Sequence, residues 1–265
     1  KLRSSGWTPR FPDYFTALEK DPPLVASILQ LVIDNPESDL PRAQNIVLIG
    51  LMGSGKSTVS RALLKLIQPT GGQAYYEERE ILNLPENQFR PLRREMQMIF
   101  QDPIGSLNPR MTIESILAEP QEIHFPDQTR QQRREISAGL LKKVGLPEDA
   151  LTRYPHEFSG GQRQSIGIAR ALAVRPRVLV CDEPVSALDV SVQASILNLL
   201  KDLQDEFRLT YLFIAHDLAV VRHMSDDIIV MNRGVVVETG PADDVCERPQ
   251  HDYTRKLLAS IPALG

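Results

Sequence analysis

The chain has 265 residues, of which 42% are hydrophobic and 24% charged, so it can bury a substantial core as one large domain or two small ones. The formal net charge of −4 gives no overall basic surface, and we therefore expect no nucleic-acid partner. Apolar runs such as Ser27–Ile33 and Tyr211–Ala215 are far shorter than the roughly 20 residues that cross a bilayer, so a partner protein would have to supply any link to a membrane.

The first part of the chain predicts little regular structure. Prolines interrupt residues 1–44 repeatedly, which leaves room for only a short helix at about 24–32. No cationic, apolar leader precedes this segment, which favours residence in the cytoplasm. The chain's two cysteines, Cys181 and Cys246, lack C-x-x-C spacing, so the sequence predicts neither a zinc site nor a disulfide framework.

From residue 45 the pattern becomes clear. The apolar run at 45–50 predicts a strand that ends in glycine, and residues 57–67 follow it with helical spacing. A turn is expected at 69–72, and residues 95–103 alternate like a strand that stops at proline. The stretch 104–155 is predicted to be mainly helical, with Gly145 ending one of its helices.

The second half alternates between helices and strands. A helix is predicted from Ser159, followed by a strand at 177–184, a helix at 191–207, a strand at 210–217, a hairpin that turns at 232–234 and a final helix at 255–260. This alternation predicts an α/β fold with a mostly parallel sheet that helices cover on both faces. We expect an ATPase core at 45–102 and 156–240, a helical subdomain at 103–155, an atypical segment at 1–44 and a helical tail at 241–265.

Residues 50–57, GLMGSGKS, match the phosphate-loop pattern G-x-x-x-x-G-K-[ST] between a strand and a helix. The glycines allow backbone amides to surround phosphates, Lys56 can reach the β- and γ-phosphates, and Ser57 can bind Mg²⁺. The alternative is a simple glycine turn before a helix. The candidate nucleotide-binding residues here are Gly50, Gly53, Ser54, Gly55, Lys56, Ser57 and Thr58.

Asp182 and Glu183 end a predicted buried strand, at the edge of a parallel sheet where ligands bind. Asp182 would hold Mg²⁺, and Glu183 would accept a proton from the attacking water or orient it. Gln101 follows another strand and is a candidate ligand of the Mg²⁺ shell and the water, while His216 ends a third strand and is a candidate γ-phosphate contact. The alternatives are an acidic pair at a helix start, and strand-end residues without a ligand.

A second glycine-rich stretch, FSGGQ at 158–162, opens another predicted helix. Ser159 is a good N-cap, and Gly160 and Gly161 leave amides of the helix start accessible to an anion. Since Lys56 already completes one phosphate site, we interpret this loop as a cover for the γ-phosphate held by another copy of the fold, so that a pair closes over two ATP molecules. The alternative is a helix start that binds nothing.

Together these motifs resemble the ATP-binding subunit of ABC transporters, in order and in spacing, over about residues 46–263. The resemblance makes Gly50–Ser57 the Walker A motif, Gln101 the Q-loop, VLVCDE at 178–183 Walker B, SALD with Asp189 the D-loop and His216 the switch histidine. It also makes FSGGQ the signature motif, with Ser159, Gly160, Gly161 and Gln162. The stretches RYPHEFSGGQRQSIGIARALA and ERPQHDYTRKLLASIP resemble the oligopeptide/dipeptide importers in particular.

The resemblance implies a P-loop NTPase fold with an inserted helical subdomain, and ATP hydrolysis with Mg²⁺ that powers peptide import. It implies as partners a second ATPase subunit, like or unlike, permease subunits and, indirectly, an extracytoplasmic solute-binding protein, with the chain at the cytoplasmic face of the membrane. Glu183, His216 and Gln101 would be catalytic, and Ser57, Gln101 and Asp182 would serve the metal.

Two stretches depart from the family pattern. Residues 1–44 do not show the usual β-rich segment with an aromatic residue that stacks on adenine; Phe11, Tyr14 and Phe15 are only candidates for that aromatic. The sequence of residues 45–59 is more similar to the phosphate loop of shikimate kinases than to that of the family. One alternative function is therefore a soluble small-molecule kinase, although a kinase has no use for FSGGQ and SALD. Another is a non-transport ABC ATPase that acts on DNA or ribosomes.

Overall fold

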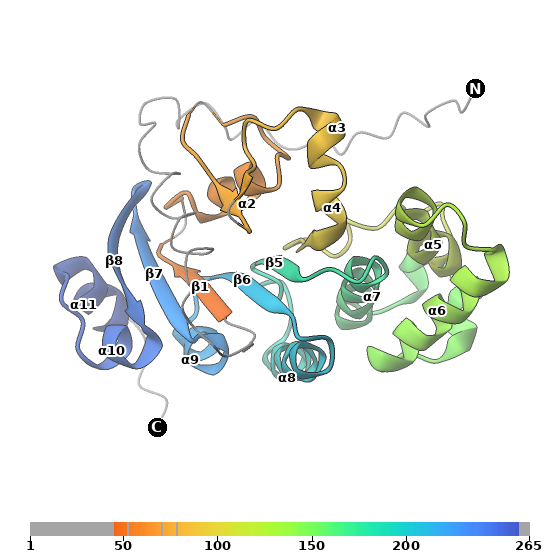
Figure 1. Ribbon diagram of the computed structural model, residues 1–265. Coiled ribbons are helices and arrows are strands. Elements are labelled where there is room, and N and C mark those ends of the chain that lie inside the picture. Colours follow the sequence, from red (N-terminus) through yellow and green to blue (C-terminus); the bar gives the residue numbers. More distant parts are fainter. Residues whose placement is uncertain (1–44, 52, 70, 78, 260–265) are drawn as a thin grey trace.

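A computed structural model describes residues 45–259 except 52, 70 and 78 (Figure 1). The helix predicted at about 24–32, and the aromatic candidates Phe11, Tyr14 and Phe15, lie outside these residues. None of the described helices combines the length and the apolar character needed to cross a membrane.

A six-stranded sheet with the strand order β4-β5-β6-β1-β7-β8 organises the described residues. All neighbouring strands are parallel except β7 and β8, which form an antiparallel pair. The strands of this sheet are β1 Asn45–Ile49, β4 Met96–Ile99, β5 Val178–Asp182, β6 Thr210–Ala215, β7 Asp227–Asn232 and β8 Val235–Pro241. The predicted α/β fold with a mostly parallel sheet is therefore confirmed.

Helices cover both faces of this sheet, as the sequence predicted (Figure 1). On one side lie α2 Lys56–Leu63, α3 Glu86–Phe89 and α4 Leu92–Glu95, with a small antiparallel pair of β2 Tyr75–Tyr76 and β3 Arg79–Glu80. On the other lie α7 Gly160–Leu172, α8 Val190–Phe207 and α9 Leu218–Met224. Beyond the sheet edges lie α5 Ile113–His124 and α6 Arg130–Lys143 with the 3₁₀ turns Glu148–Thr152 and Pro155–Glu157, and, at the opposite end, α10 Ala242–Glu247 and α11 Asp252–Ala259.

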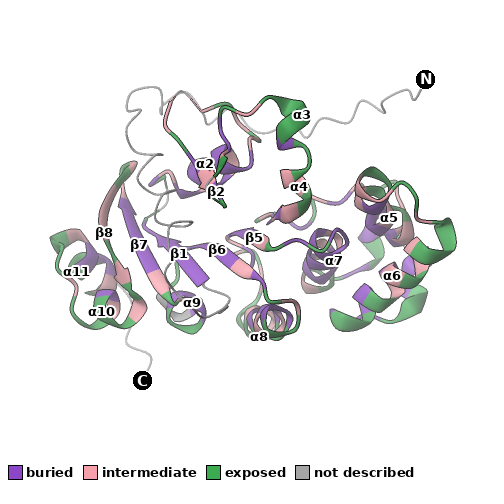
Figure 2. Ribbon diagram, in the orientation of Figure 1, coloured by how far each residue is buried: buried purple, intermediate pink, exposed green. Residues whose placement is uncertain are grey.

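The alternation of side chains along each strand creates two hydrophobic cores. Val47 and Ile49 of β1 belong to the core shared with α7, α8 and α9, whereas Ile46 and Leu48 belong to the core under α2. Because neighbouring side chains in a strand point to opposite faces, the continuous apolar run of β1 is what a strand buried on both faces requires. Figure 2 shows the sheet strands β1 and β7 mostly buried, with exposed surface on the outer helices.

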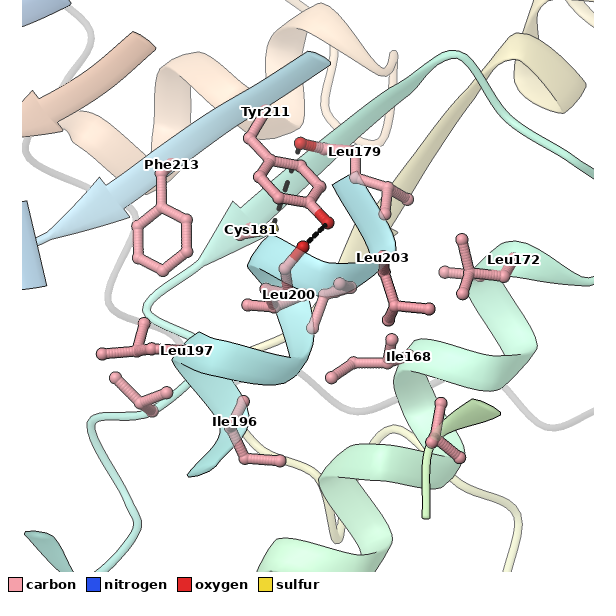
Figure 3. Close-up of a cluster of buried hydrophobic side chains, with 14 of the residues drawn as sticks. Ile168, Leu172, Leu179, Cys181, Ile196, Leu197, Leu200, Leu203, Tyr211 and Phe213 are labelled. Carbon is pink, nitrogen blue, oxygen red and sulfur yellow. Dashed lines mark hydrogen bonds between the residues drawn. The ribbon is translucent and has the colours of Figure 1, made fainter. Parts of the chain in front are cut away.

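Helix α8 shows how the larger core is closed. Its residues Ile196, Leu200 and Leu203 are buried against the sheet, at the spacing of one helix face (Figure 3). The hydroxyl of Tyr211, on β6, donates to the carbonyl of Leu200 at 2.7 Å, so this ring is buried without leaving its polar atom unpaired.

The observed elements differ from the predicted ones mainly at their ends. The strand predicted at 95–103 is shorter, because Glu95 ends α4 and the pairing with β5 stops at Ile99. The final helix starts at Asp252 rather than at residue 255. Gly145 follows α6 with φ +76°, as expected for a glycine that ends a helix, and the predicted turn at 232–234 joins β7 to β8.

Candidate functional site

The phosphate-loop sequence forms a tight turn between β1 and α2. Gly53 and Gly55 have φ values of +77° and +94°, a region that other residues rarely adopt, and Gly55 is the N-cap of α2. A Cβ atom at Gly50 would lie 2.2 Å from the carbonyl oxygen of Met231, so only glycine fits where β1 ends beside β7. The amides of this loop therefore gather at the N-terminus of a helix, an arrangement that favours an anion.

Lys56 is folded back into the loop that precedes it. Its Nζ donates to the carbonyl of Gly50 at 2.7 Å and to Ser54 Oγ at 3.2 Å, and the residue is only 4% exposed. Burial lowers the pKa of this ammonium, while the nearby Glu183 and Asp182 act in the opposite direction. The lysine thus lies on the inner side of the loop, with neutral acceptors that a phosphate oxygen can replace.

Ser57 and Asp182 meet beside Lys56, as expected for two contributors to one magnesium site. The hydroxyl of Ser57 donates to Asp182 Oδ1 at 2.6 Å, and Asp182 is fully buried at the end of β5. A hydroxyl and a carboxylate are oxygen ligands of the kind that Mg²⁺ prefers, and this ion usually binds through one or two protein oxygens together with substrate phosphates. The residues present therefore fit the metal that the motif implies.

Arg61 is a member of this site that the sequence analysis did not single out. Its NH2 lies 3.2 Å from Asp182 Oδ2, on the side of the carboxylate opposite Ser57. The sequence spacing could have indicated this residue, because Arg61 comes four residues after Ser57 and so lies on the same face of α2.

Three candidate catalytic residues come together at the carboxyl ends of their strands. Glu183, directly after β5, has its Oε2 at 3.0 Å from Gln101 Nε2, and His216 Nδ1 lies 3.4 Å from the same oxygen. Glu183 also has φ +47°, a left-handed conformation that is uncommon for a residue other than glycine. Backbone strain of this kind clusters at functional sites, where it fixes a side chain in an otherwise unfavourable direction.

The second glycine-rich loop forms the expected helix start. Ser159 is the N-cap of α7, its Oγ accepts from the amide of Gln162 at 3.3 Å, and Gln162 Oε1 accepts from the amide of Ser159 at 3.0 Å. Ser159, Gly160 and Gln162 are exposed. These two bonds form a capping box that engages the amides of Ser159 and Gln162 and leaves those of Gly160 and Gly161, in the first turn of α7, without a side-chain partner among the described residues.

Gly160 and Gly161 lie against the start of α8 and the residue Leu188 just before it. A Cβ at Gly161 would lie 2.5 Å from Val192 Cγ1, whereas one at Gly160 would lie 3.5 Å from Leu188 Cδ2, an ordinary contact distance. Asp189 is the N-cap of α8, where it is exposed and its side chain makes no capping bond. The signature and SALD motifs therefore share one surface of the chain.

This packing predicts different outcomes for the two glycines. Gly161→Ala should lower the free energy of unfolding by about 1–3 kcal/mol, the usual cost of overpacking, because the short, β-branched Val192 has little rotamer freedom in a helix. Gly160→Ala is the matched control and should unfold nearly as the wild type does. Chemical denaturation of both variants measures the difference, and equal stabilities would contradict the close packing at Gly161.

The structure thus gathers the predicted residues into two groups. One contains the phosphate loop, including Thr58 in the first turn of α2, together with Asp182, Glu183, Gln101 and His216. The other contains Ser159, Gly160, Gly161 and Gln162 beside Asp189. A single chain therefore carries a phosphate-loop sequence folded at the start of α2 and a second glycine-rich loop at the start of α7.

Family models agree with these motifs. The model described as ABC transporter matches residues 33–186, and it begins inside the segment 1–44 that the sequence set apart as atypical. A second model, the C-terminal region of oligopeptide/dipeptide transporters, matches residues 237–265.

Relatives and solved structures lead to the same family. The chain is 48% identical over 230 residues to the oligopeptide transport ATP-binding protein OppF of Escherichia coli K12, a match that covers 87% of this chain and 69% of OppF. It is 50% identical over 233 residues to the dipeptide transport ATP-binding protein DppF of Lactococcus lactis subsp. cremoris, covering 87% and 75%.

Among solved structures, the dimeric post-hydrolysis state of the ATP-binding cassette MJ0796 bound to ADP and Pi has a TM-score of 0.68 at 30% identity, covering 76% of this chain and 86% of that one. The structure of cbiO1 from Clostridium perfringens, part of the ABC transporter complex cbiONQ, has a TM-score of 0.69 at 26% identity, covering 83% and 85%. The chain belongs to the ATP-binding cassettes of the ABC transporter family and carries the C-terminal region of its oligopeptide/dipeptide transporters.

Proposed function

We propose that the chain is the ATP-hydrolysing subunit of a membrane importer of oligopeptides or dipeptides. The observation that carries this proposal is the meeting of Gln101 and His216 on Glu183, next to the cradle formed by Lys56 and Asp182. The C-terminal match at residues 237–265, and the names of the peptide-transport relatives, support the peptide as the transported solute.

Each residue of the first group has a distinct part in hydrolysis. The loop amides and Lys56 would hold the β- and γ-phosphates of ATP. Ser57 and Asp182 would hold Mg²⁺, which would neutralise the negative charge that grows on the phosphate oxygens. Glu183 accepts a proton from the attacking water, so that the water oxygen gains nucleophilic character. Gln101 and His216 fix the position of the Glu183 carboxylate and, through it, the water.

The second group acts on a neighbouring copy. Ser159 and the exposed amides of α7 cover the γ-phosphate that Lys56 of the partner subunit holds, and two such contacts close a pair over two ATP molecules. The dimeric MJ0796 cassette, at 30% identity, supports this arrangement. The partner is either a second copy of this chain or an unlike ATPase of the same family.

A groove connects the ATP site to the region proposed to meet the membrane subunits. Its volume is about 570 Å³, and residues of α2, α4, β4, α5 and α7 line it together with the segment 100–106. Ile104 at the start of the helical region and Ile123 of α5 are 63% and 52% exposed. We assign this groove and the helical subdomain 103–155 to the permease subunits, which would keep the chain at the cytoplasmic face of the membrane.

Gln101 belongs both to the ATP site and to the groove, because it contacts Glu183 and also lines the groove. Arg170 of α7 donates to the carbonyl of Ser106, so the segment after Gln101 is tied to the helix that carries the signature loop. A change at the γ-phosphate that moves Gln101 would therefore also move the groove wall and α7. Through this coupling, closure of the two ATPase subunits would be transmitted to the permease subunits.

Two experiments test this function. In the first, purified chain with Mg²⁺ and ATP should release phosphate to water, and transfer to an added metabolite would instead identify a small-molecule kinase.

In the second experiment, the tagged chain is purified from its own cells with its membranes solubilised. Co-purification of integral membrane subunits supports the importer, whereas ribosomes or DNA without such subunits would contradict it.

A further inference from the structure

We propose that the hydroxyl of Tyr253 positions the phosphate loop, so that the C-terminal segment of this chain raises its affinity for nucleotide. The amide of Leu51, the second residue of the phosphate-loop motif, donates to Tyr253 Oη at 3.1 Å across 202 residues of sequence. This inference rests on the proposed function, because it concerns the same ATP site. The candidate site residues predicted from the sequence do not include Tyr253, which lies in α11.

The Leu51 amide is a suitable point at which to hold the loop. It precedes the amides of residues 53–56 that surround the phosphates, so a tyrosine can occupy it without competing with nucleotide. The carbonyl of Leu51 is already used inside the loop, where it accepts from the amide of Ser54 at 3.1 Å and from Lys56 Nζ at 3.3 Å. With the Tyr253 contact, both the amide and the carbonyl of Leu51 are hydrogen-bonded.

Tyr253 is itself held on the sheet. Glu238 of β8 accepts from the amides of Gln250 at 2.7 Å and His251 at 3.1 Å, just before α11 begins, and His251 Nδ1 accepts from the amide of Tyr253 at 3.1 Å. Glu238 is paired with Val230 of β7, and Val230 is paired with Ile49 at the end of β1. Tyr253 is thus connected to the loop's own strand, β1, through β8 and β7.

A second contact from the same part of the chain holds the middle of the loop. The amide of Gly234, in the turn between β7 and β8, donates to the carbonyl of Ser54 at 3.0 Å. The β7–β8 hairpin and α11 therefore hold the loop at Ser54 and at Leu51. Holding a loop in its bound shape lowers the entropy lost on binding, which increases affinity without a new contact to the ligand.

Tyr253→Phe tests the proposal because it removes one oxygen and keeps the ring. We expect the dissociation constants of ADP and of a non-hydrolysable ATP analogue, measured with Mg²⁺ by calorimetry, to rise about two- to tenfold, the range for one lost hydrogen bond. KM for ATP should rise by the same factor while kcat stays near the wild-type value. In nucleotide-free protein, the Leu51 amide should exchange its hydrogen faster.

Tyr75→Phe is the matched control, since the hydroxyl of Tyr75 also makes one exposed hydrogen bond, to Gln73 Oε1 at 3.3 Å, but on β2. It should leave all these values unchanged. Wild-type dissociation constants in Tyr253→Phe would overturn the inference, even if its melting temperature were lower, because the hydroxyl would then serve stability alone. Failure of the wild-type chain to bind ADP would instead overturn the proposed function.

Discussion

Glu183→Gln should bind ATP as the wild type does and hydrolyse it about 10²- to 10⁴-fold more slowly, the range that a general base contributes. Glutamine has the size of glutamate but does not accept the proton of the attacking water. ATP binding should survive, because Lys56, Ser57 and Asp182 are unchanged. Phosphate release at saturating ATP measures the first effect, and calorimetry or a nucleotide-dependent thermal shift measures the second.

Glu247→Gln is a suitable control for this variant. Glu247 is an exposed carboxylate of α10 that pairs only loosely with Arg222, at 3.9 Å. Its replacement should leave turnover near normal. Near-normal turnover in Glu183→Gln itself would remove this glutamate from the role of base, whatever its contacts with Gln101 and His216.

Lys56→Met should weaken ATP binding about 10- to 100-fold, which corresponds to about 1.5–3 kcal/mol for hydrogen bonds to a charged group. The melting temperature of the nucleotide-free protein should fall only modestly. Methionine removes the donor to the Gly50 carbonyl and to Ser54 Oγ, which costs stability, but it also removes an ammonium whose pKa burial lowers, which offsets part of that cost. Thermal unfolding with and without Mg²⁺ and ATP separates the two effects.

Lys65→Met provides the comparison, because Lys65 is also a lysine near α2 but donates to the carbonyl of Leu84 and lies over the ring of Phe89. This variant should lose stability and keep the ATP-dependent shift. If Lys56→Met retained the full shift, the phosphate cradle would have to lie elsewhere in the chain.

Much of this site could be predicted because its residues follow strands. Asp182, Gln101 and His216 each lie at or just after the carboxyl end of a parallel strand, and parallel strands place such ends at one edge of the sheet. The N-cap role of Ser159 was also predicted, because serine followed by two glycines is typical of a helix start.

Other features depend on packing that no local pattern reveals. The elements β2, β3, α3 and α4 are each two to four residues long, too short for a periodic signal. They form because Ile81 and Phe89 are fully buried in the core under α2. The contact between Tyr253 and Leu51 likewise joins residues far apart in sequence, and it depends on the exact register of β7 with β8.

The most direct test of the whole account is a structure of the Glu183→Gln chain trapped with ATP and Mg²⁺, together with its ATPase partner. The account predicts two ATP molecules at a subunit interface. At the site that Lys56 of this chain holds, the partner's signature serine contacts the γ-phosphate, and Ser159 of this chain does the same for the partner's ATP. A trapped assembly in which Ser159 faces bulk solvent, away from any neighbouring ATP, would contradict it.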